Sequence, residues 1–346
     1  MTAQTDVGYH AIQHGRWRAS EFAFWLLALA SAFLFPSRYL IMTDIVRLGL
    51  FALSLDLILG YAGIVSLGHA AFFGVGAYSA GLLALHGIVT EPVIALVVAG
   101  LVATAVGFLT SFLVIRGVDL TRLMVTLGIA LLLEALAERF SNITGGTDGL
   151  QGIEMQPILG LFAFDMFGKV GFFYSLGVLF VLFLLARRIV HSPFGLSLRA
   201  IRNNPLRAAA IGIPVNRRLI AVYTLAAFYA GIAGALFTQT TALASLDVFS
   251  FERSADLMLV LVLGGTGYLY GGLIGAVVFK MLQEVFSTIT PQYWQFWIGL
   301  VLVLIVLVGR DRFGSWTGGV RALAVGVLRR FSRGGAPVPV PPGEGR

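Results

Sequence analysis

The residues of this sequence that could carry chemistry are a few charged side chains and one histidine, all set within or at the ends of long apolar runs. Glu134 and Glu138 are four residues apart, as are Lys280 and Glu284, so each pair shares one face of a helix. Carboxylates in such a setting can bind cations or relay protons. The deepest charges, which are costly in lipid and should face a bundle interior or its boundary, are Asp56, Glu134, Glu138, Arg139, Lys280 and Glu284.

Several catalytic devices are absent from the sequence. It contains no cysteine, which excludes disulfides, thiolate metal sites and cysteine nucleophiles. It has no phosphate-binding GxxxxGK[ST] loop, no HExxH zinc motif and no nucleophile elbow. We therefore expect no catalytic residue, no metal ligand and no cofactor bound by this chain.

A glycine-rich stretch at Gly60–Gly81 interrupts an apolar run, and six of its 22 residues are glycine. Such density weakens a helix by about 1 kcal/mol per glycine relative to alanine. It allows close helix packing, or an unwound turn that offers backbone groups to a solute. His69 is either a ligand contact or proton relay, or a histidine hydrogen-bonded between helices. The candidate path residues here are Gly60, Gly63, Ser66, Gly68, His69, Phe72, Gly76 and Tyr78.

A second glycine-rich stretch, Gly264–Gly275, loosely echoes the first. Paired breaks in the two halves of a transporter indicate the path of the solute, whereas close helix packing alone is the alternative. The candidate path residues in this stretch are Gly264, Gly265 and Gly267.

A polar island at Gly195–Arg218 holds five arginines and no acid. Asn204 is suited to an N-cap, Pro205 to the first helical position and Gly212 to a left-handed C-cap. These residues predict a helix of about two turns. So short a helix is marginal in water, so it must pack on the protein's own surface or on a partner. The residues we assign to such a contact are Arg199, Arg202, Asn203, Asn204, Pro205, Ala208, Ala209 and Gly212.

A third polar segment closes an apolar run, and its composition predicts a turn; a plain loop is the alternative. It consists of Thr144, Gly145, Gly146, Thr147 and Asp148, followed by Gly149.

The composition indicates which kind of secondary structure must position these residues. Of 346 residues, 58% are hydrophobic and 12% are charged, against about 25% charged in soluble domains, so lipid must solvate much of the chain. The apolar runs are near 20 residues long, which favours helices over barrel strands. The net charge of +7 comes from arginines at the ends of these runs, so no nucleic-acid partner is expected.

Ten apolar spans can be counted. The first begins near Phe22, could be mistaken for a cleaved signal because of Ala30-Ser31-Ala32, and is read instead as a helix broken near Pro36. The others are 45–59, 64–85, 92–115, 120–140, 171–190, 219–240, 255–267, 271–288 and 293–309. Reading 255–288 as two short spans places the arginine-rich C-terminal region on the same side as the polar island, as the positive-inside rule requires.

This topology divides the chain into three parts: a cytoplasmic segment 1–21, a membrane domain 22–312 with a cytoplasmic loop 191–218, and a cytoplasmic, partly disordered tail 313–346. The connections 141–170 and 241–254 are then external.

Four motifs in this order resemble the permease subunits of branched-chain amino acid ABC transporters of the LivM type. They are GYAGIVSLGHAAFFGVGAY at 60–78, ITGGTDGL at 143–150, SPFGLSLRAIRNNPLRAAAIGI at 192–213 and LVLGGTGYLYGG at 261–272. The resemblance runs from about Arg47 to Arg312. The tail from Phe313 departs from it, as do Tyr268 and Tyr270.

The resemblance implies an all-α polytopic membrane protein of about ten spans in the bacterial inner membrane, with both termini cytoplasmic. It implies four kinds of partner: a second, related permease, two ABC ATPase subunits that use ATP, a periplasmic solute-binding protein, and an amino-acid substrate. The loop at 191–218 would then be the ATPase-coupling loop. The alternatives are a proton-coupled carrier that uses Glu134, Glu138 or His69, and an ABC permease for urea or short amides.

Overall fold

The computed structural model describes residues 19–117, 119–165 and 167–308, and in these ranges the regular secondary structure is helical, with two isolated β-bridges. It forms two compact units, Met1–Val285 and Phe286–Arg346. The predictions for residues 1–18 and for the tail from 309 onward lie outside the described residues.

The longer helices of the first unit are α2 (Ala19–Leu34), α3 (Tyr39–Ala62), α4 (Ala70–Leu85), α5 (Pro92–Arg116), α6 (Asp119–Arg139), α8 (Lys169–Val190), α9 (Pro193–Asn203), α11 (Val215–Thr241), α12 (Phe251–Gly264) and α13 (Leu269–Ile289), the last of which continues past Val285. Shorter elements are α7 (Ser141–Thr144), η1 (Gly146–Asp148), α10 (Pro205–Ala210) and η2 (Leu246–Phe249). The second unit contributes α14 (Trp294–Val308), and there the ring of Phe286 stacks on Trp297 with centroids 6.3 Å apart.

Each of the ten predicted apolar runs falls on a helix, and 255–288 is two helices, as predicted. Among the described residues, however, six helices are long and apolar enough to cross a membrane: α3, α5, α6, α8, α11 and α13. Helices α2, α4 and α14 are apolar but shorter, and α12 has 14 residues. The chain is therefore a polytopic helical membrane protein, and its crossing by ten spans stays a prediction.

Helix α2 contains the predicted start of the first run at Phe22, and the chain breaks at Pro36 as expected. The carboxylate of Glu21 on α2 pairs with the guanidinium of Arg187 on α8. Trp25 adds edge-on contacts with Phe180 and Phe183 of the same helix. This part of the first predicted span is thus tied to α8 by both charge and aromatic packing.

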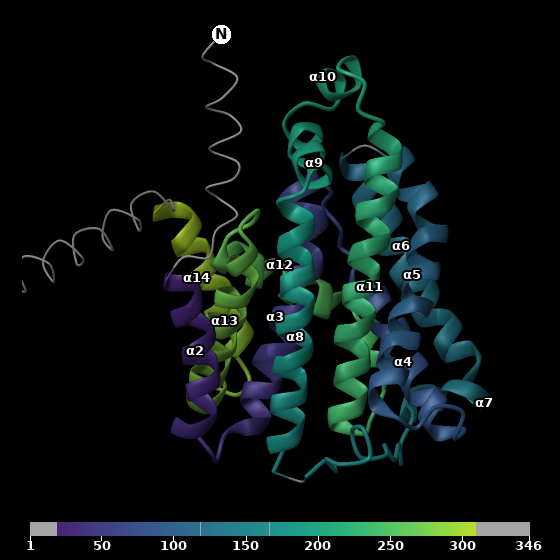
Figure 1. The fold of residues 1–346 in the computed structure, drawn as a ribbon, viewed down its shortest axis with the longest axis vertical. Helices are drawn as coiled ribbons and strands as arrows, with labels where there is room; N and C mark the ends of the chain where they lie inside the picture. Colours follow the sequence, from purple (N-terminus) through teal and green to yellow (C-terminus); the bar gives the residue numbers. More distant parts are fainter. Residues whose placement is uncertain (1–18, 118, 166, 309–346) are drawn as a thin grey trace, which may run out of the picture. The chain divides into compact units, whose positions relative to one another are not determined.

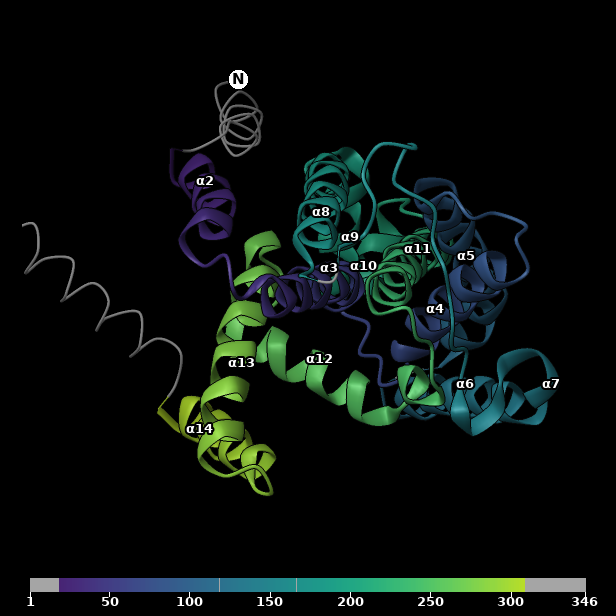
Figure 2. The ribbon, with the colours of Figure 1, turned by 90° about the horizontal axis from the view of Figure 1, so that it is seen from below.

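Helix α11 packs closely against α4 and α5, and α3 lies against α8, α11 and α12 (Figures 1 and 2). Glycines allow the closest of these contacts. A Cβ atom at Gly76 would overlap the backbone of Gly231, and one at Gly234 would overlap the carbonyl of Phe73. Small residues bring membrane helices into van der Waals contact in this way, so α4 and α11 form the tight centre of the unit.

Two helices, α4 and α12, extend over only part of the distance between the two ends of the first unit. After α3 ends, the segment Gly63–His69 is unwound and leads to α4. The N–H of Leu67 in this segment donates to Thr126 Oγ1 of α6 at 3.2 Å, so α4 starts beside the interior of α6 rather than beside its end. Helix α12 begins at the same depth, because Ala70 N–H, at the start of α4, donates to Ser254 Oγ at 3.0 Å. The first turns of α4 and α12 therefore meet inside the unit.

The two ends of the unit carry different elements. Helices α9 and α10 lie at one end and α7 at the opposite end (Figure 1). At the α7 end, Leu150 and Ala244 form an antiparallel bridge with N–H to O distances of 2.7 and 3.1 Å. The segments predicted to be external, 141–170 and 241–254, are thus joined on one side, opposite the polar island.

Candidate functional site

The two glycine-rich breaks meet at one junction. The carboxylate of Asp56, one turn before Gly60 on α3, accepts a 2.7 Å hydrogen bond from the N–H of Gly267. A Cβ atom at Gly60 would overlap both the Asp56 carboxylate and the Gly267 nitrogen. Gly267 itself has a φ of 78°, a left-handed conformation that favours glycine. Both glycines are therefore required by the close approach of the two breaks.

An arginine from the polar island completes this junction. The guanidinium of Arg202, near the end of α9, donates to the carbonyl of Gly60. A Cβ atom at Gly63 would lie 3.1 Å from the Cγ of Arg202, and one at Gly267 would lie 2.8 Å from its Nη1. Its neighbour one turn earlier, Arg199, stacks over the ring of Tyr61 at 5.4 Å. We name the group Asp56, Gly60, Arg202 and Gly267 the glycine junction.

Helix α9 was not predicted as a separate element, although the sequence carried its signals. Ser192-Pro193 is a typical start, and Phe194, Leu198 and Ile201 recur at helical spacing. Leu198 and Ile201 are buried at 1% and 2% exposure. The sequence analysis assigns Arg199 and Arg202 to a coupling contact, and in the structure both remain exposed while they contact Tyr61 and Gly60 of α3.

The short helix predicted within the island is α10, Pro205–Ala210. The side chain of Asn204 accepts from Arg207 N–H at 3.0 Å, as an N-cap should. Gly212 has a φ of 87°, and the bonds Gly212 N–H to Ala209 O (2.9 Å) and Ile213 N–H to Ala208 O (3.0 Å) form a Schellman C-cap. The sequence prediction of this helix, with both caps, is confirmed.

One side of α10 faces the protein and the other does not. Ala208 is buried where α10 packs against α9 and α11, whereas Leu206 and Ile211 are 83% and 75% exposed. Arg207 is exposed between them, and Ala209 is exposed as well. The helix is thus held by its own chain and still presents apolar and cationic groups outward.

His69 is fully buried just before α4. Its Nε2 lies 2.9 Å from Ser54 Oγ of α3, and its ring stacks on Phe51 with centroids 5.8 Å apart. This geometry favours the histidine hydrogen-bonded between helices over a solute contact. Nδ1 of the same ring has no hydrogen-bond partner among the described residues.

The other predicted path residues separate into two groups. Gly63, Ser66 and Gly68 lie in the unwound segment, and a Cβ at Gly68 would overlap the carbonyl of Thr126. Phe72, Gly76 and Tyr78 lie on α4 and are buried in helix contacts. Gly264 and Gly265 end α12, where a Cβ atom at Gly264 would overlap the carbonyl of Gly271. Both readings of the glycine motifs, an unwound turn and close packing, therefore hold in different places.

The segment at Thr144–Gly149 is an ordered turn. Gly145, Gly146 and Gly149 have φ values of 75°, 60° and 70°. The hydroxyl of Thr144 donates back to the carbonyl of Ala137 at 2.5 Å and accepts from Gly146 N–H at 3.3 Å. Thr147 and Asp148 are exposed.

The charges within the spans do not gather into one relay. Glu138 is exposed and Glu134 is half-buried on α6, while Lys280 lies 3.9 Å from Asp44 and Glu284 lies 3.9 Å from Arg38. Among the residues that the structure describes, no group of three His, Asp or Glu side chains has the arrangement of a metal site.

Comparison with known proteins identifies the family. The model described as the permease component of the branched-chain amino acid transport system matches residues 38–306. The chain belongs to this family of transport permeases.

Several curated permeases are similar to the chain. The high-affinity branched-chain amino acid permease protein LivM of Escherichia coli (strain K12) is 28% identical over 279 residues, which cover 74% of this chain and 64% of LivM. The chain thus spans a little less than two thirds of that relative. The ribose import permease RbsC of Bacillus subtilis is 30% identical over 171 residues, 45% of this chain and 53% of RbsC. No solved structure matches the chain.

Proposed function

We propose that this chain is the membrane-spanning permease subunit of an ABC importer for branched-chain amino acids in the bacterial inner membrane. It would pair with a second, related permease, receive substrate from a periplasmic binding protein and be driven by two ATPase subunits that use ATP. Membership of the permease family over residues 38–306 supports the class, and the similarity to LivM supports the substrate.

The observation that carries the mechanism is the glycine junction. Arg202 joins α9 to the carbonyl of Gly60, and Asp56 joins the same turn of α3 to Gly267. Helix α10 follows α9 after a single residue, Asn204. If a partner displaces α10, the displacement is therefore transmitted to the ends of α3 and α12 through two hydrogen bonds.

The outward side of α10 suits a protein partner. Leu206 of α10 and Ile211, the C-cap residue of this helix, are large apolar side chains that are exposed. Exposed apolar side chains beside arginine are typical of the centre of a protein interface. We infer that a pocket on the ATPase receives these side chains, so that closure of the ATPase dimer moves α9 and α10 together.

The two unwound turns would be the parts of the solute path that change conformation. Unwound backbone at membrane depth is tolerated where protein covers it or where it lines a cavity, and discontinuous helices form solute sites in transporters. Here Gly63–His69 precedes α4, and the turn at Gly265–Tyr268 precedes α13. Rearrangement at these two turns would open the unit alternately to each side.

The test is reconstitution of the complex in proteoliposomes. The chain is co-purified with the second permease and the ATPase subunits, ATP is enclosed or supplied on the ATPase side, and uptake of labelled leucine is measured with the binding protein present. We expect uptake that requires ATP and is reduced by excess isoleucine or valine, and not by ribose or urea.

Other results would assign the chain differently. Uptake by the chain alone, driven by a pH gradient without ATPase, would establish the proton-coupled carrier instead. ATP-driven uptake inhibited by ribose, urea or a short amide would keep the ABC class and replace the substrate.

A further inference from the structure

A cavity of about 230 Å³ opens at the end of the first unit opposite α9 and α10. It lies where the starts of α3 and α8 approach the end of α11. This volume is below the roughly 300–1,000 Å³ of pockets for drug-sized ligands, so it suits a smaller solute. The wall includes Leu40, Thr43, Asp44, Arg47, Thr240 and Thr241.

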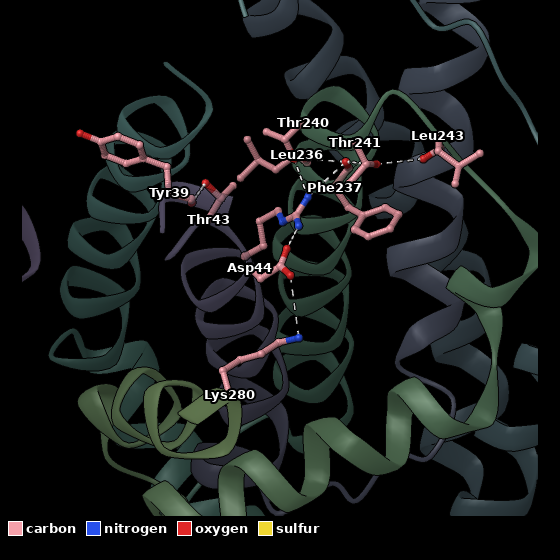
Figure 3. Close-up of polar contacts among 10 residues, drawn as sticks. Tyr39, Thr43, Asp44, Leu236, Phe237, Thr240, Thr241, Leu243 and Lys280 are labelled. Carbon is pink, nitrogen blue, oxygen red and sulfur yellow. Dashed lines mark hydrogen bonds and ion pairs between the residues drawn. The ribbon is translucent and has the colours of Figure 1, made fainter. Parts of the chain in front are cut away.

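Arg47 forms the cationic part of this wall. Its guanidinium is 5.0 Å from the centroid of the Phe237 ring and donates to the Phe237 carbonyl at 3.3 Å (Figure 3). It also donates to Thr240 Oγ1 and to the carboxylate of Asp44. A guanidinium has five N–H donors, and these contacts use three. Arg47 is therefore held firmly while it keeps the capacity to bind a carboxylate.

Asp44 forms the anionic part. One oxygen of its carboxylate accepts from Arg47, and the other lies 3.9 Å from the ammonium of Lys280 on α13 (Figure 3). The Asp44 side chain nevertheless remains 41% exposed. Since a carboxylate offers about four acceptor positions, it can accept additional donors from the cavity. The hydroxyl of Thr43, which donates to the Tyr39 carbonyl at 2.8 Å, can accept there too.

A second pair of the same type gives an internal comparison. Arg253 stacks on the Phe237 ring at 5.0 Å and is bound by Asp247 at 2.6 Å. Neither Arg253 nor Asp247 belongs to the cavity wall. An aspartate–arginine pair on Phe237 thus occurs once in the wall of this cavity and once outside that wall, so the second pair serves as a control for a packing role.

We propose that this cavity is a subsite for a free α-amino acid, in which Asp44 and Thr43 bind the ammonium group, Arg47 binds the carboxylate, and Leu40 contacts the aliphatic side chain. A second carboxylate in the wall, Asp165, accepts from the N–H groups of Lys169 and Val170. Together with Asp44 and Arg47 it gives the wall charges of both signs, which suit a zwitterion. The proposal rests on the proposed function and adds to it a location for the solute on the outer side of the permease.

The absence of cysteine from the chain permits a direct test. In the reconstituted complex, Thr241→Cys places a single thiol of this chain in the cavity wall. Its rate of modification by a small methanethiosulfonate reagent is measured with and without L-leucine. Thr90→Cys is the control, because Thr90 lies on the same side, where its carbonyl accepts from Gln156 N–H, and outside the cavity wall. We expect leucine to slow modification at Thr241 about fivefold or more and to leave Thr90 unchanged.

Chemical analogues identify the two charged contacts. 4-Methylpentanoate lacks the ammonium group and 3-methylbutylamine lacks the carboxylate, so each should protect Thr241→Cys far less than leucine. Asp44→Asn should weaken protection by leucine about tenfold and remove its advantage over 4-methylpentanoate, whereas Asp247→Asn should keep both. A structural role for Asp44 would lower protection by all ligands alike.

The results that would contradict the subsite differ from those that would contradict the proposed function. If the complex imports leucine with ATP while leucine protects Thr241→Cys and Thr90→Cys equally, the subsite is wrong and the importer stands. The subsite is also wrong if Asp44→Asn and Asp247→Asn behave alike, or if phosphatidylethanolamine vesicles protect the thiol and leucine does not, which would indicate a lipid headgroup. Absence of ATP-driven uptake would instead overturn the importer.

Discussion

The N–H of Gly267 donates to the carboxylate of Asp56 across 2.7 Å, although the two residues are 211 positions apart in the sequence. This bond joins a turn between α12 and α13 to the last part of α3, at the point where Arg202 of α9 also binds. The glycine junction is therefore where the two halves of the chain and the polar island come together.

Replacement of Asp56 by alanine should destabilise the protein. The partly buried Gly267 N–H would lose its acceptor, and an unsatisfied buried donor costs about 1–3 kcal/mol. Asp56→Asn keeps an oxygen at the same place and should retain most of the stability. Thermal unfolding of both variants in detergent checks this, and equal loss in the two would show that the negative charge matters more than the hydrogen bond.

Replacement of Arg202 by alanine should separate ATP hydrolysis from uptake. The variant loses a charge-assisted hydrogen bond worth about 1.5–3 kcal/mol, so that α9 and α10 no longer carry Gly60 with them. We expect uptake to fall about tenfold while hydrolysis persists. Arg188→Ala is the matched control, because Arg188 is an exposed arginine on the neighbouring α8. An unchanged ratio of uptake to hydrolysis in the Arg202 variant would contradict the coupling role.

Removal of the cap at Asn204 should loosen α10 without preventing membrane insertion. An N-cap asparagine contributes about 1 kcal/mol relative to alanine, and a helix of six residues has little else to hold it. Hydrogen exchange of the α10 amides should therefore be faster in Asn204→Ala and near normal in Asn204→Asp, which also caps well. Uptake per ATP should follow the same order.

Neighbouring alanines on α10 should respond differently to glutamate. Ala208 is 2% exposed, so Ala208→Glu buries a charge without a partner and should lower the yield of folded protein. Ala209 is exposed, so Ala209→Glu should insert and fold normally but weaken ATPase binding to the membrane subunits. Co-purification of the ATPase measures this effect. Normal co-purification of the Ala209 variant would argue that α10 packs only on its own chain.

Much of the helical arrangement could be predicted from the sequence, because runs near 20 apolar residues and helix caps are local signals. The two caps of α10, the break at Pro36 and the separation of α12 from α13 follow from residues within one or two turns. The placement of 141–170 and 241–254 on one side was predicted from charge bias, whereas their pairing through Leu150 and Ala244 was not.

Contacts over long sequence distances could not be predicted in this way. No local pattern shows that Asp56 faces Gly267, or that Arg202 contacts Gly60, because each depends on where another helix ends. The shortness of α12 was predicted, but that of α4 was missed. The apolar run predicted at 64–85 continues into the unwound Gly63–His69, and hydropathy does not distinguish helix from covered, unwound backbone.

The bridge between Leu150 and Ala244 has a consequence for communication across the membrane. Ala244 is followed closely by η2 and α12, and α12 ends beside Gly267 at the far side. A displacement of the exposed Thr147 and Asp148 would therefore be transmitted through η2 and α12 to the turn that contacts Asp56 and Arg202. Because coupling between sites acts equally in both directions, binding at this turn and binding at α10 would each alter the affinity of the other site.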